Sequence, residues 1–283
     1  MRTIPCTLAL LLGLSLPARA IDIERIEPGN WWVGMQHNRV ELLVHGTGIG
    51  ASTPRLSRDG VAIVDVQNTD NPNYLFVTLE IAGDAVPGGV DIEFVDAGKV
   101  VATHPWRLDA REPGSAQRRG FDARDAIYLV TPDRFANGDP SNDSVPGMLE
   151  AANRANPDGR HGGDIAGIRQ HLDYIAGMGF TQLWPTPFLE NNQPQYSYHG
   201  YAITDLYKTD PRMGRNEDVR ALSREAKAKG VGLVMDIVLN HIGSKHWWMT
   251  DLPARDWINS PRIWGGGRLW PCWVHQGSAN LLC

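Results

Sequence analysis

The sequence predicts a two-part chain, with an all-β sandwich followed by an α/β unit that contains a parallel sheet. Between residues 21 and 111, apolar and polar side chains alternate with a period of two, which is typical of half-buried strands. After residue 125, short apolar runs alternate with segments of helical spacing in the order β-α-β-α-β, which favours a parallel sheet with right-handed crossovers. A chain of 283 residues has room for both parts.

The first 20 residues have the pattern of an export signal. Arg2 gives a positive start, an apolar run follows from Leu8 to Leu16, and Ala18-Arg19-Ala20 is a small-x-small cleavage site. A buried helix or a membrane anchor is the alternative, but the run is far shorter than the roughly 20 residues that a span needs. We therefore expect cleavage near Ala20, export to the periplasm or the medium, and no membrane span.

Charge and cysteine content add two further expectations. The net charge of -5 gives no basic footprint, so nucleic acid is not an expected partner. Cys272 and Cys283 remain after cleavage, and an oxidising compartment would permit a bridge between them. Two cysteines in a short tail are weak evidence for such a bridge.

Residues 21–111 are predicted to form an immunoglobulin-like β-sandwich. The alternation is clearest in Leu75–Ile81 and Val90–Phe94, and Asp59-Gly60 and Pro87-Gly88-Gly89 are among the turn signals that separate the strands. Residues 112–124 are polar and rich in helix and strand breakers, so we place a linker there.

Residues 125–259 are predicted to form the α/β unit, and residues 260–283 fit neither period. Gly177 and Gly179 end the first helix, and Asn216 is the predicted N-cap of the second. In chain order, the expected elements are a strand over Ala126–Val130, a helix over Ile165–Ile175, a strand over Phe180–Trp184, a helix over Asn216–Lys229 and a strand over Val231–Leu239.

The last of these strands carries an acid where a buried strand should be apolar. Asp236 breaks the apolar run, and Asn240 and His241 follow where the strand emerges. Active sites of parallel barrels form at the carboxyl ends of the strands, so these residues are candidates for a site. The alternative is a hydrogen-bonded buried Asp followed by an ordinary strand-end cap.

Three segments in order resemble the α-amylase family of glycoside hydrolases. Asp236–His241 resembles the end of the third barrel strand, Gly179–Pro187 resembles the second strand, and Tyr198–Tyr201 resembles the segment that follows it. The resemblance implies that residues 125–259 are the first part of a (β/α)8 TIM barrel.

The same resemblance implies a substrate-binding set. Tyr201 would stack on the pyranose ring of the sugar being cleaved, and His199 would hydrogen-bond a hydroxyl. His241 would contact the same sugar, and Asp236 would support the geometry of the site. The alternative for His199 and Tyr201 is ordinary loop packing.

Oxygen ligands are concentrated between residues 137 and 164, and hard cations such as Ca²⁺ take six to eight oxygens. The segment resembles the calcium site near the first barrel strand of cyclodextrin glycosyltransferases and neopullulanase-like proteins. The ligand set that this implies is Asn137, Asp139, Asn142, Asp143, the Gly162 carbonyl and Asp164. The alternatives are turn chemistry for Asn-Gly-Asp-Pro and helix capping for Asp164.

The segment Pro28–Met35 resembles the sandwich that precedes the barrel in cyclomaltodextrinases and neopullulanases. The resemblance implies a role in forming homodimers and in narrowing the site toward cyclic or short glucans. Trp31 and Trp32 would also fit a plain role in the sandwich core, and the two interpretations are compatible.

Together these resemblances imply an exported α-glucan hydrolase of the cyclomaltodextrinase or neopullulanase type, acting on an α-glucan or a cyclodextrin with retention. That reaction uses a nucleophilic Asp and an acid Glu about 5 Å apart. The family segments that bear these acids do not occur in the 283 residues, so we assign no catalytic residue.

We therefore expect a chain truncated after its third barrel strand, naturally or by a frameshift, and inactive as it stands. Its open sheet would expose unpaired edges, which makes the partial barrel marginal while the sandwich folds alone. The alternative function is a non-catalytic glucan-binding or interaction protein.

Overall fold

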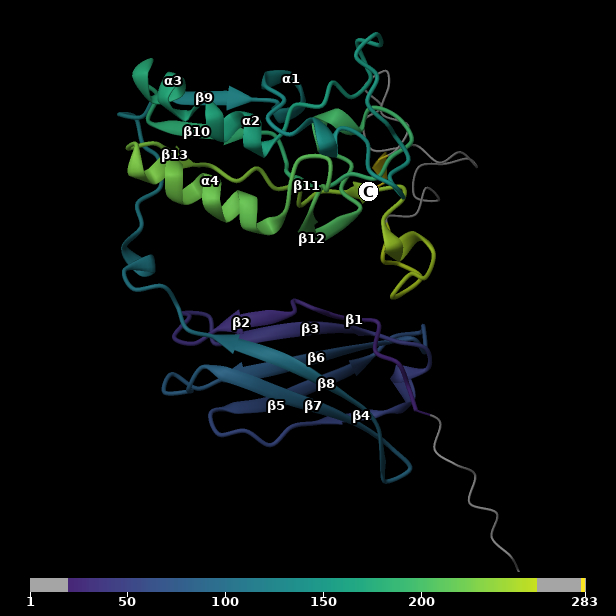
Figure 1. Ribbon diagram of the computed structural model, residues 1–283. Coiled ribbons are helices and arrows are strands. Elements are labelled where there is room, and N and C mark those ends of the chain that lie inside the picture. Colours follow the sequence, from purple (N-terminus) through teal and green to yellow (C-terminus); the bar gives the residue numbers. More distant parts are fainter. Residues whose placement is uncertain (1–19, 259–280, 283) are drawn as a thin grey trace, which may run out of the picture. The chain divides into compact units, whose positions relative to one another are not determined.

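The computed structural model describes residues 20–258 and 281–282 (Figure 1). Residues 1–19, which hold most of the predicted export signal, and residues 259–280 and 283, including Cys272 and Cys283, lie outside the described residues. The chain divides into two compact units, Met1–Gln117 and Arg118–Cys283, which are treated separately below.

The amino-terminal unit is a sandwich of two four-stranded sheets, with strand orders β1-β3-β6-β5 and β2-β8-β7-β4. Most pairs are antiparallel, and β2 runs parallel to β8. The strands are β1 (Arg25–Glu27), β2 (Asn30–Trp32), β3 (Arg39–His45), β4 (Thr53–Arg55), β5 (Val61–Asn68), β6 (Tyr74–Ile81), β7 (Gly88–Asp96) and β8 (Lys99–Asp109).

The period of two places one face of each central strand in the core. On β7, Val90, Ile92 and Phe94 are buried while Asp91 between them is exposed, which confirms the predicted alternation. Apolar residues of both sheets meet in one cluster that includes the fully buried Trp106. The two adjacent tryptophans of β2 differ, because Trp31 packs against this cluster and Trp32 is 40% exposed.

The second unit contains a three-stranded parallel sheet in the order β13-β10-β9, as the sequence predicts. Helices α2 and α4 lie alongside it, and their apolar faces form one core with residues of the sheet (Figure 1). The helices and strands are β9 (Ile127–Val130), α1 (Pro132–Phe135), α2 (Ile165–Gln170), α3 (Leu172–Gly177), β10 (Gln182–Pro185), β11 (Leu189–Glu190), β12 (Asp205–Thr209), α4 (Asn216–Ala228), β13 (Gly232–Leu233), β14 (Ile242–Gly243) and β15 (Leu281–Leu282).

Two details of the predicted helices are wrong. The first helix is interrupted at His171, whose ring Nδ1 lies 2.8 Å from the carbonyl oxygen of Gly167, so α2 and α3 are separate. The N-cap of α4 is Arg215 rather than Asn216, because the Asn216 side chain instead accepts hydrogen bonds from Thr209. Asp218 accepts a hydrogen bond from the Arg215 backbone N–H at this end of the helix.

The third predicted strand is much shorter than expected. Only Gly232 and Leu233 pair with β10, and one further backbone hydrogen bond runs from Val234 to Leu183. Residues 234–239 continue without ladder pairing within the described part of the chain. The predicted strand over Val231–Leu239 is therefore correct only near its amino-terminal end.

The sheet leaves large apolar side chains in contact with solvent. Leu129 and Trp184 are opposite each other in register and are 58% and 37% exposed. Met235, Ile237 and Leu239 are exposed along the unpaired segment. Exposed apolar side chains beside an unpaired strand edge agree with the expected open sheet of a partial barrel.

Within the described residues, no helix is both long enough and apolar enough to cross a bilayer.

Replacing Phe94 by Ala should destabilise the sandwich by about 3–5 kcal/mol, because a fully buried ring is lost and a cavity is left. Hydrogen exchange of the β6 and β7 amides measures this loss within the sandwich itself. The control is Val86→Ala, which removes a side chain that is 67% exposed and should change the same free energy by less than about 0.5 kcal/mol. Equal effects of the two substitutions would contradict the assigned core.

Candidate functional site

The carboxylate of Asp236 joins residues from two strand ends. Its Oδ2 accepts a hydrogen bond from the Tyr201 hydroxyl at 2.8 Å and another from the Trp184 indole Nε1 at 3.1 Å. Trp184 lies on β10, Tyr201 lies in the loop between β11 and β12, and Asp236 lies three residues after β13. The parallel strands β10 and β13 therefore bring these three side chains to the same carboxyl edge of the sheet.

Two histidine rings form hydrogen bonds with the backbone of Tyr201, one with its N–H and one with its carbonyl. The Tyr201 N–H donates to His199 Nδ1 at 2.9 Å, which leaves the other ring nitrogen of His199 to carry the proton. His241 Nε2 donates to the Tyr201 carbonyl at 3.0 Å. The rings of His199 and Tyr201 stack with centroids 5.8 Å apart, so the cluster presents two near-parallel ring faces.

The environment shifts two ionisation equilibria in this cluster. Burial first, and the neighbouring His241 second, lower the pKa of His199 to about 4, so its imidazole is neutral at neutral pH. Burial, followed by the hydrogen bond to Asp236 and the charge of that residue, raises the pKa of Tyr201 to about 12. The cluster thus offers neutral ring donors and acceptors around a single carboxylate.

The structure brings together all four residues of the sequence-derived substrate set, namely His199, Tyr201, Asp236 and His241. Each is partly buried, so each retains surface that faces solvent. Sequence reasoning did not assign a role to Trp184, although it lies in the segment used for the resemblance. The available signal was a tryptophan close to the carboxyl end of the second predicted strand, where the sites of parallel barrels form.

The residues proposed as cation ligands form two groups. Asp164 is fully buried and accepts hydrogen bonds from the backbone N–H groups of Gly138, Asp139 and Gly167 and from the Asn142 side chain. Asp164 is the N-cap of α2, which confirms the alternative interpretation of this residue as a helix cap. The carboxylate of Asp139 accepts hydrogen bonds from Ser141, which lower its pKa.

The remaining residues of the set carry unused oxygen acceptors. Asn137 donates through Nδ2 to Asp143 Oδ1 at 2.6 Å, and a side chain at Gly162 would meet that same Asp143 oxygen at 2.4 Å. The buried side-chain oxygens of Asn137 and Asn142 accept no hydrogen bond from any described residue. Buried oxygens without donors are the ligands that a hard cation takes, so this part of the loop fits Ca²⁺.

The described residues hold no group of three or more His, Cys, Asp or Glu side chains placed to share a metal. A cation at this loop would therefore depend on amide and carbonyl oxygens together with Asp143.

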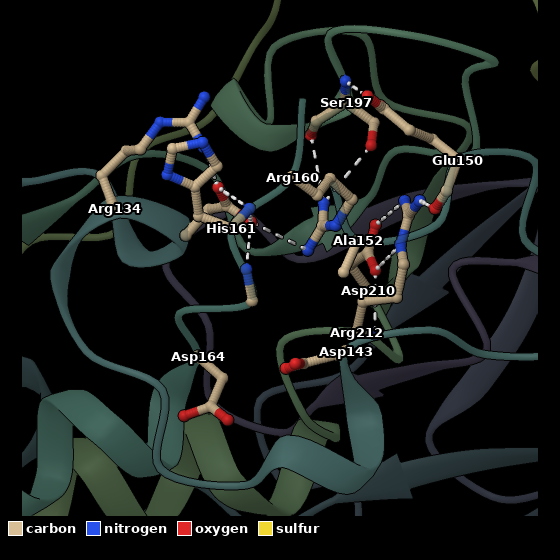
Figure 2. A network of polar contacts seen from close by, with 12 residues as sticks. Arg134, Asp143, Glu150, Ala152, Arg160, His161, Asp164, Ser197, Asp210 and Arg212 are labelled. Atoms are coloured by element: carbon tan, nitrogen blue, oxygen red, sulfur yellow. Dashed lines mark hydrogen bonds and ion pairs between the residues drawn. The ribbon is translucent and has the colours of Figure 1, made fainter. Parts of the chain in front are cut away.

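Beneath the loop that carries His199 lies a cluster of fully buried charges (Figure 2). Arg212 donates from Nε and Nη2 to the two carboxylate oxygens of Asp210 at 2.9 and 2.7 Å, a bidentate pair. Burial alone raises the pKa of Asp210, but the hydrogen bonds and charge of Arg212 outweigh it and hold the pKa below its ordinary value. Arg160 is also fully buried, and burial lowers its pKa.

Asp133 ties this cluster to the turn that contains Gly162. Its carboxylate accepts hydrogen bonds from the backbone N–H groups of His161 and Gly162, and it lies 3.8 Å from Arg160 Nη2. Sequence reasoning missed the four buried charges Asp133, Arg160, Asp210 and Arg212. The close pair Asp210-Pro211-Arg212 was an available signal, whereas Arg160 has the sequence appearance of a surface residue.

His199 should make the second unit less stable in acid. Its folded pKa of about 4 lies below the ordinary 6.5, so the unfolded chain binds a proton first and stability falls as pH drops through this interval. Urea denaturation between pH 6.5 and pH 4 measures the effect, and His199→Gln should remove this part of the pH dependence. His37→Gln, at an exposed position, is the control. A profile that H199Q leaves unchanged would contradict the assigned burial.

Two family models match the chain. The α-amylase catalytic domain matches residues 129–269, and the amino-terminal domain of cyclomaltodextrinase matches residues 25–112. Together the two matches cover most of the chain, and the second falls on the sandwich.

Known proteins match parts of this chain over 123 to 200 residues. Neopullulanase 2 of Thermoactinomyces vulgaris is 38% identical over 200 residues, which is 65% of this chain and 31% of the relative. The β/α-amylase of Paenibacillus polymyxa is 42% identical over 123 residues, or 43% of this chain and 10% of the relative. The periplasmic α-amylase of Escherichia coli is 37% identical over 135 residues, or 44% of this chain and 20% of the relative.

The chain thus spans less than a third of the length of each of these relatives. Both of its parts nevertheless match, since the catalytic-domain model covers the parallel sheet and the strand-end cluster while the cyclomaltodextrinase model covers the sandwich. The chain belongs to the α-amylase family of glycoside hydrolases, in the subgroup that contains cyclomaltodextrinases and neopullulanases.

Proposed function

We propose that the strand-end cluster is the sugar-contacting part of an α-glucan site of the cyclomaltodextrinase or neopullulanase type. The observation that carries this proposal is the convergence of His199, Tyr201, Asp236 and His241 from two loops onto one edge of the parallel sheet. The names of the matched relatives, which are amylases and a neopullulanase, support an α-glucan or cyclodextrin as the ligand.

Each residue would have a distinct task in holding one glucose unit. The apolar C–H face of a pyranose ring would pack on the Tyr201 ring, whose hydroxyl is fixed by Asp236. Neutral His199 would donate a hydrogen bond to a sugar hydroxyl through its free ring nitrogen, because its Nδ1 already accepts from Tyr201. His241, fixed by the Tyr201 carbonyl, would contact the same sugar unit.

We further propose that the 283-residue polypeptide binds glucan without hydrolysing it. Retaining hydrolysis requires two carboxyl groups about 5 Å apart, one as nucleophile and one as acid. The cluster holds one carboxylate, and Oδ2 of Asp236 already accepts hydrogen bonds from Tyr201 and Trp184. A carboxylate engaged in this way orients its neighbours and is a poor nucleophile.

Binding of maltoheptaose, measured by calorimetry, tests the site. Removing the ring in Tyr201→Ala should weaken binding by about tenfold or more, since burial of an aromatic ring contributes about 1.5–3 kcal/mol. Reducing-sugar release measured on the same samples should stay at background.

The matched control is Tyr174→Ala, which removes a ring that is 56% exposed on α3 and should leave affinity unchanged. Equal affinity of Y201A and the parent would contradict the placement of the site. Rapid release of reducing sugar by the parent would contradict the proposed lack of turnover.

We also propose that the loop from Asn137 to Asp164 binds Ca²⁺. Asn137, Asn142, Asp143 and the Gly162 carbonyl would supply direct ligands, since two of these side chains have buried oxygens without donors. Asp139 and Asp164 would hold the loop in shape through the hydrogen bonds that their carboxylates accept. The ion would cross-link the segment after β9 to the turn before α2 and so fix one wall beside the strand ends.

Adding Ca²⁺ after treatment with a chelator should raise the melting temperature of the chain. A ligand at a concentration a hundred times its Kd stabilises the folded state by about 2.7 kcal/mol. Asn142→Ala should abolish the shift, and the exposed Asn153→Ala in the same loop should retain it. A chain whose melting temperature does not respond to Ca²⁺ would contradict the proposal.

Two further parts of the proposal concern the whole protein. Export to the periplasm or the medium is supported by the pattern of the first 20 residues and by the match to a periplasmic α-amylase. Formation of homodimers through the sandwich is supported by its match to the cyclomaltodextrinase amino-terminal domain.

A further inference from the structure

Three side chains that are buried or partly buried, those of Glu150, Asn191 and Arg160, form hydrogen bonds with Ser197; Figure 2 labels Glu150 and Arg160 beside it. The Ser197 backbone N–H donates to Glu150 Oε2 at 2.7 Å, and its carbonyl accepts from Asn191 Nδ2 at 3.2 Å. Arg160 Nη1 lies 3.4 Å from the same carbonyl and 3.3 Å from the Ser197 hydroxyl. Every polar atom of Ser197 therefore has a partner outside its own loop.

Arg212 holds two of these three partners in place. It donates from Nη1 to the Glu150 carbonyl and from Nη2 to the Asn191 carbonyl, each at 2.8 Å. Asp210 accepts from the Asn191 backbone N–H at 3.0 Å and keeps Arg212 in its bidentate pair. The buried ion pair thus acts on Ser197 indirectly, through Glu150 and Asn191, which form hydrogen bonds with Ser197.

The segment next to Ser197 requires such support. Ser197 begins the 3-10 turn Ser197–His199, two residues before the ring of His199. The turn is flanked by Tyr196 at φ 59° and by Gly200 at φ 85°, both in the left-handed region, which is unfavourable for a non-glycine residue such as Tyr196. A conformation of this kind persists where the surrounding contacts over-determine it.

Arg160 is the least satisfied member of the assembly. It is fully buried, and its Nε and Nη2 donate no hydrogen bond to any residue that the structure describes. A buried guanidinium with incomplete hydrogen bonding stabilises the folded state less than an apolar side chain of similar size would. Besides its 3.8 Å ion pair with Asp133, Arg160 makes a two-point contact with Ser197, on the carbonyl and on the hydroxyl.

We propose that Arg160, supported by the Asp210–Arg212 pair, is a positioning residue that sets the sugar-facing segment from Tyr198 to Tyr201. The proposal rests on the proposed function in so far as that segment contacts sugar. The hydrogen bonds and the ion pair that the Arg160 side chain forms in the described part of the chain are with Ser197 and Asp133, so its effect is transmitted through Ser197 to the two rings that follow.

The environment of the His199 ring reports the position of this segment without any sugar. Proton NMR of the imidazole resonances gives the titration midpoint of each histidine, and the spectrum of H199Q identifies which of the nine belongs to His199. Arg160→Met removes both contacts with Ser197 at similar side-chain length. Arg169→Met is the matched control, because Arg169 forms ion pairs with Glu225 and Asp218 between α2 and α4, away from the loop.

In R160M the His199 midpoint should rise from about 4 toward 6.5, because a released segment exposes the ring to water. R160K should restore part of the shift, and R169M should leave the midpoint where it is in the parent. A folded R160M with an unchanged His199 midpoint would overturn the proposal. If R160M does not fold, Ser197→Ala takes its place, and an unchanged midpoint in that folded variant would overturn the proposal equally.

Maltoheptaose binding separates this inference from the function on which it rests. R160M should bind about tenfold more weakly than the parent, as a misplaced site does, while R169M binds as the parent does. A parent that binds no maltoheptaose refutes the proposed function, and the His199 titration still decides the positioning role. A parent that binds sugar and an R160M that binds it equally well refute the positioning role alone.

Discussion

The arrangement of the candidate site depends on the hydrogen bonds that Asp236 accepts from Tyr201 and Trp184. Each of these three residues comes from a different stretch of chain, and the short parallel pairing of β10 with β13 alone does not fix their side chains. The carboxylate, which cannot donate, is satisfied by the hydroxyl and the indole, and both donors are thereby oriented. Since the backbone of Tyr201 in turn holds His199 and His241, the position of one carboxylate determines the position of both histidine rings.

The buried charges under the loop provide a second layer of order. Charges inside a protein are costly unless they are paired and hydrogen-bonded, and here Asp210 and Arg212 satisfy each other while Arg212 also donates to two backbone carbonyls. Asp133 satisfies the N–H groups of the turn that precedes α2. One buried polar network thus contacts both Ser197, which precedes the proposed sugar segment, and the turn at Gly162 in the proposed cation loop.

The sequence predicts the parts of the fold that depend on local pattern. Alternation on β6 and β7, the order of strands and helices, and Asp164 as the cap of α2 all follow from spacing within a few residues. The length of the third strand does not, because it depends on pairing with β10, which is distant in sequence, and the last hydrogen bond to β10 in the described part of the chain is that of Val234. Arg160 and Ser197 are 37 residues apart, and nothing in either neighbourhood indicates that they meet. The four substrate residues came from a family resemblance, and their mutual contacts emerge only from the structure.

Ionisation of Tyr201 tests most directly whether Asp236 organises the site. An ultraviolet titration of tyrosinate, with Tyr201→Phe to identify the signal, should give a midpoint of about 12 in the parent, because burial of Tyr201 first, and then the hydrogen bond to Asp236 and its charge, disfavour the phenolate. Asp236→Asn removes the charge while keeping the shape, so the midpoint should fall below that of the parent, while burial still holds it above 10.0. A Tyr201 that titrates near 10.0 in the parent and does not respond to D236N would contradict the account.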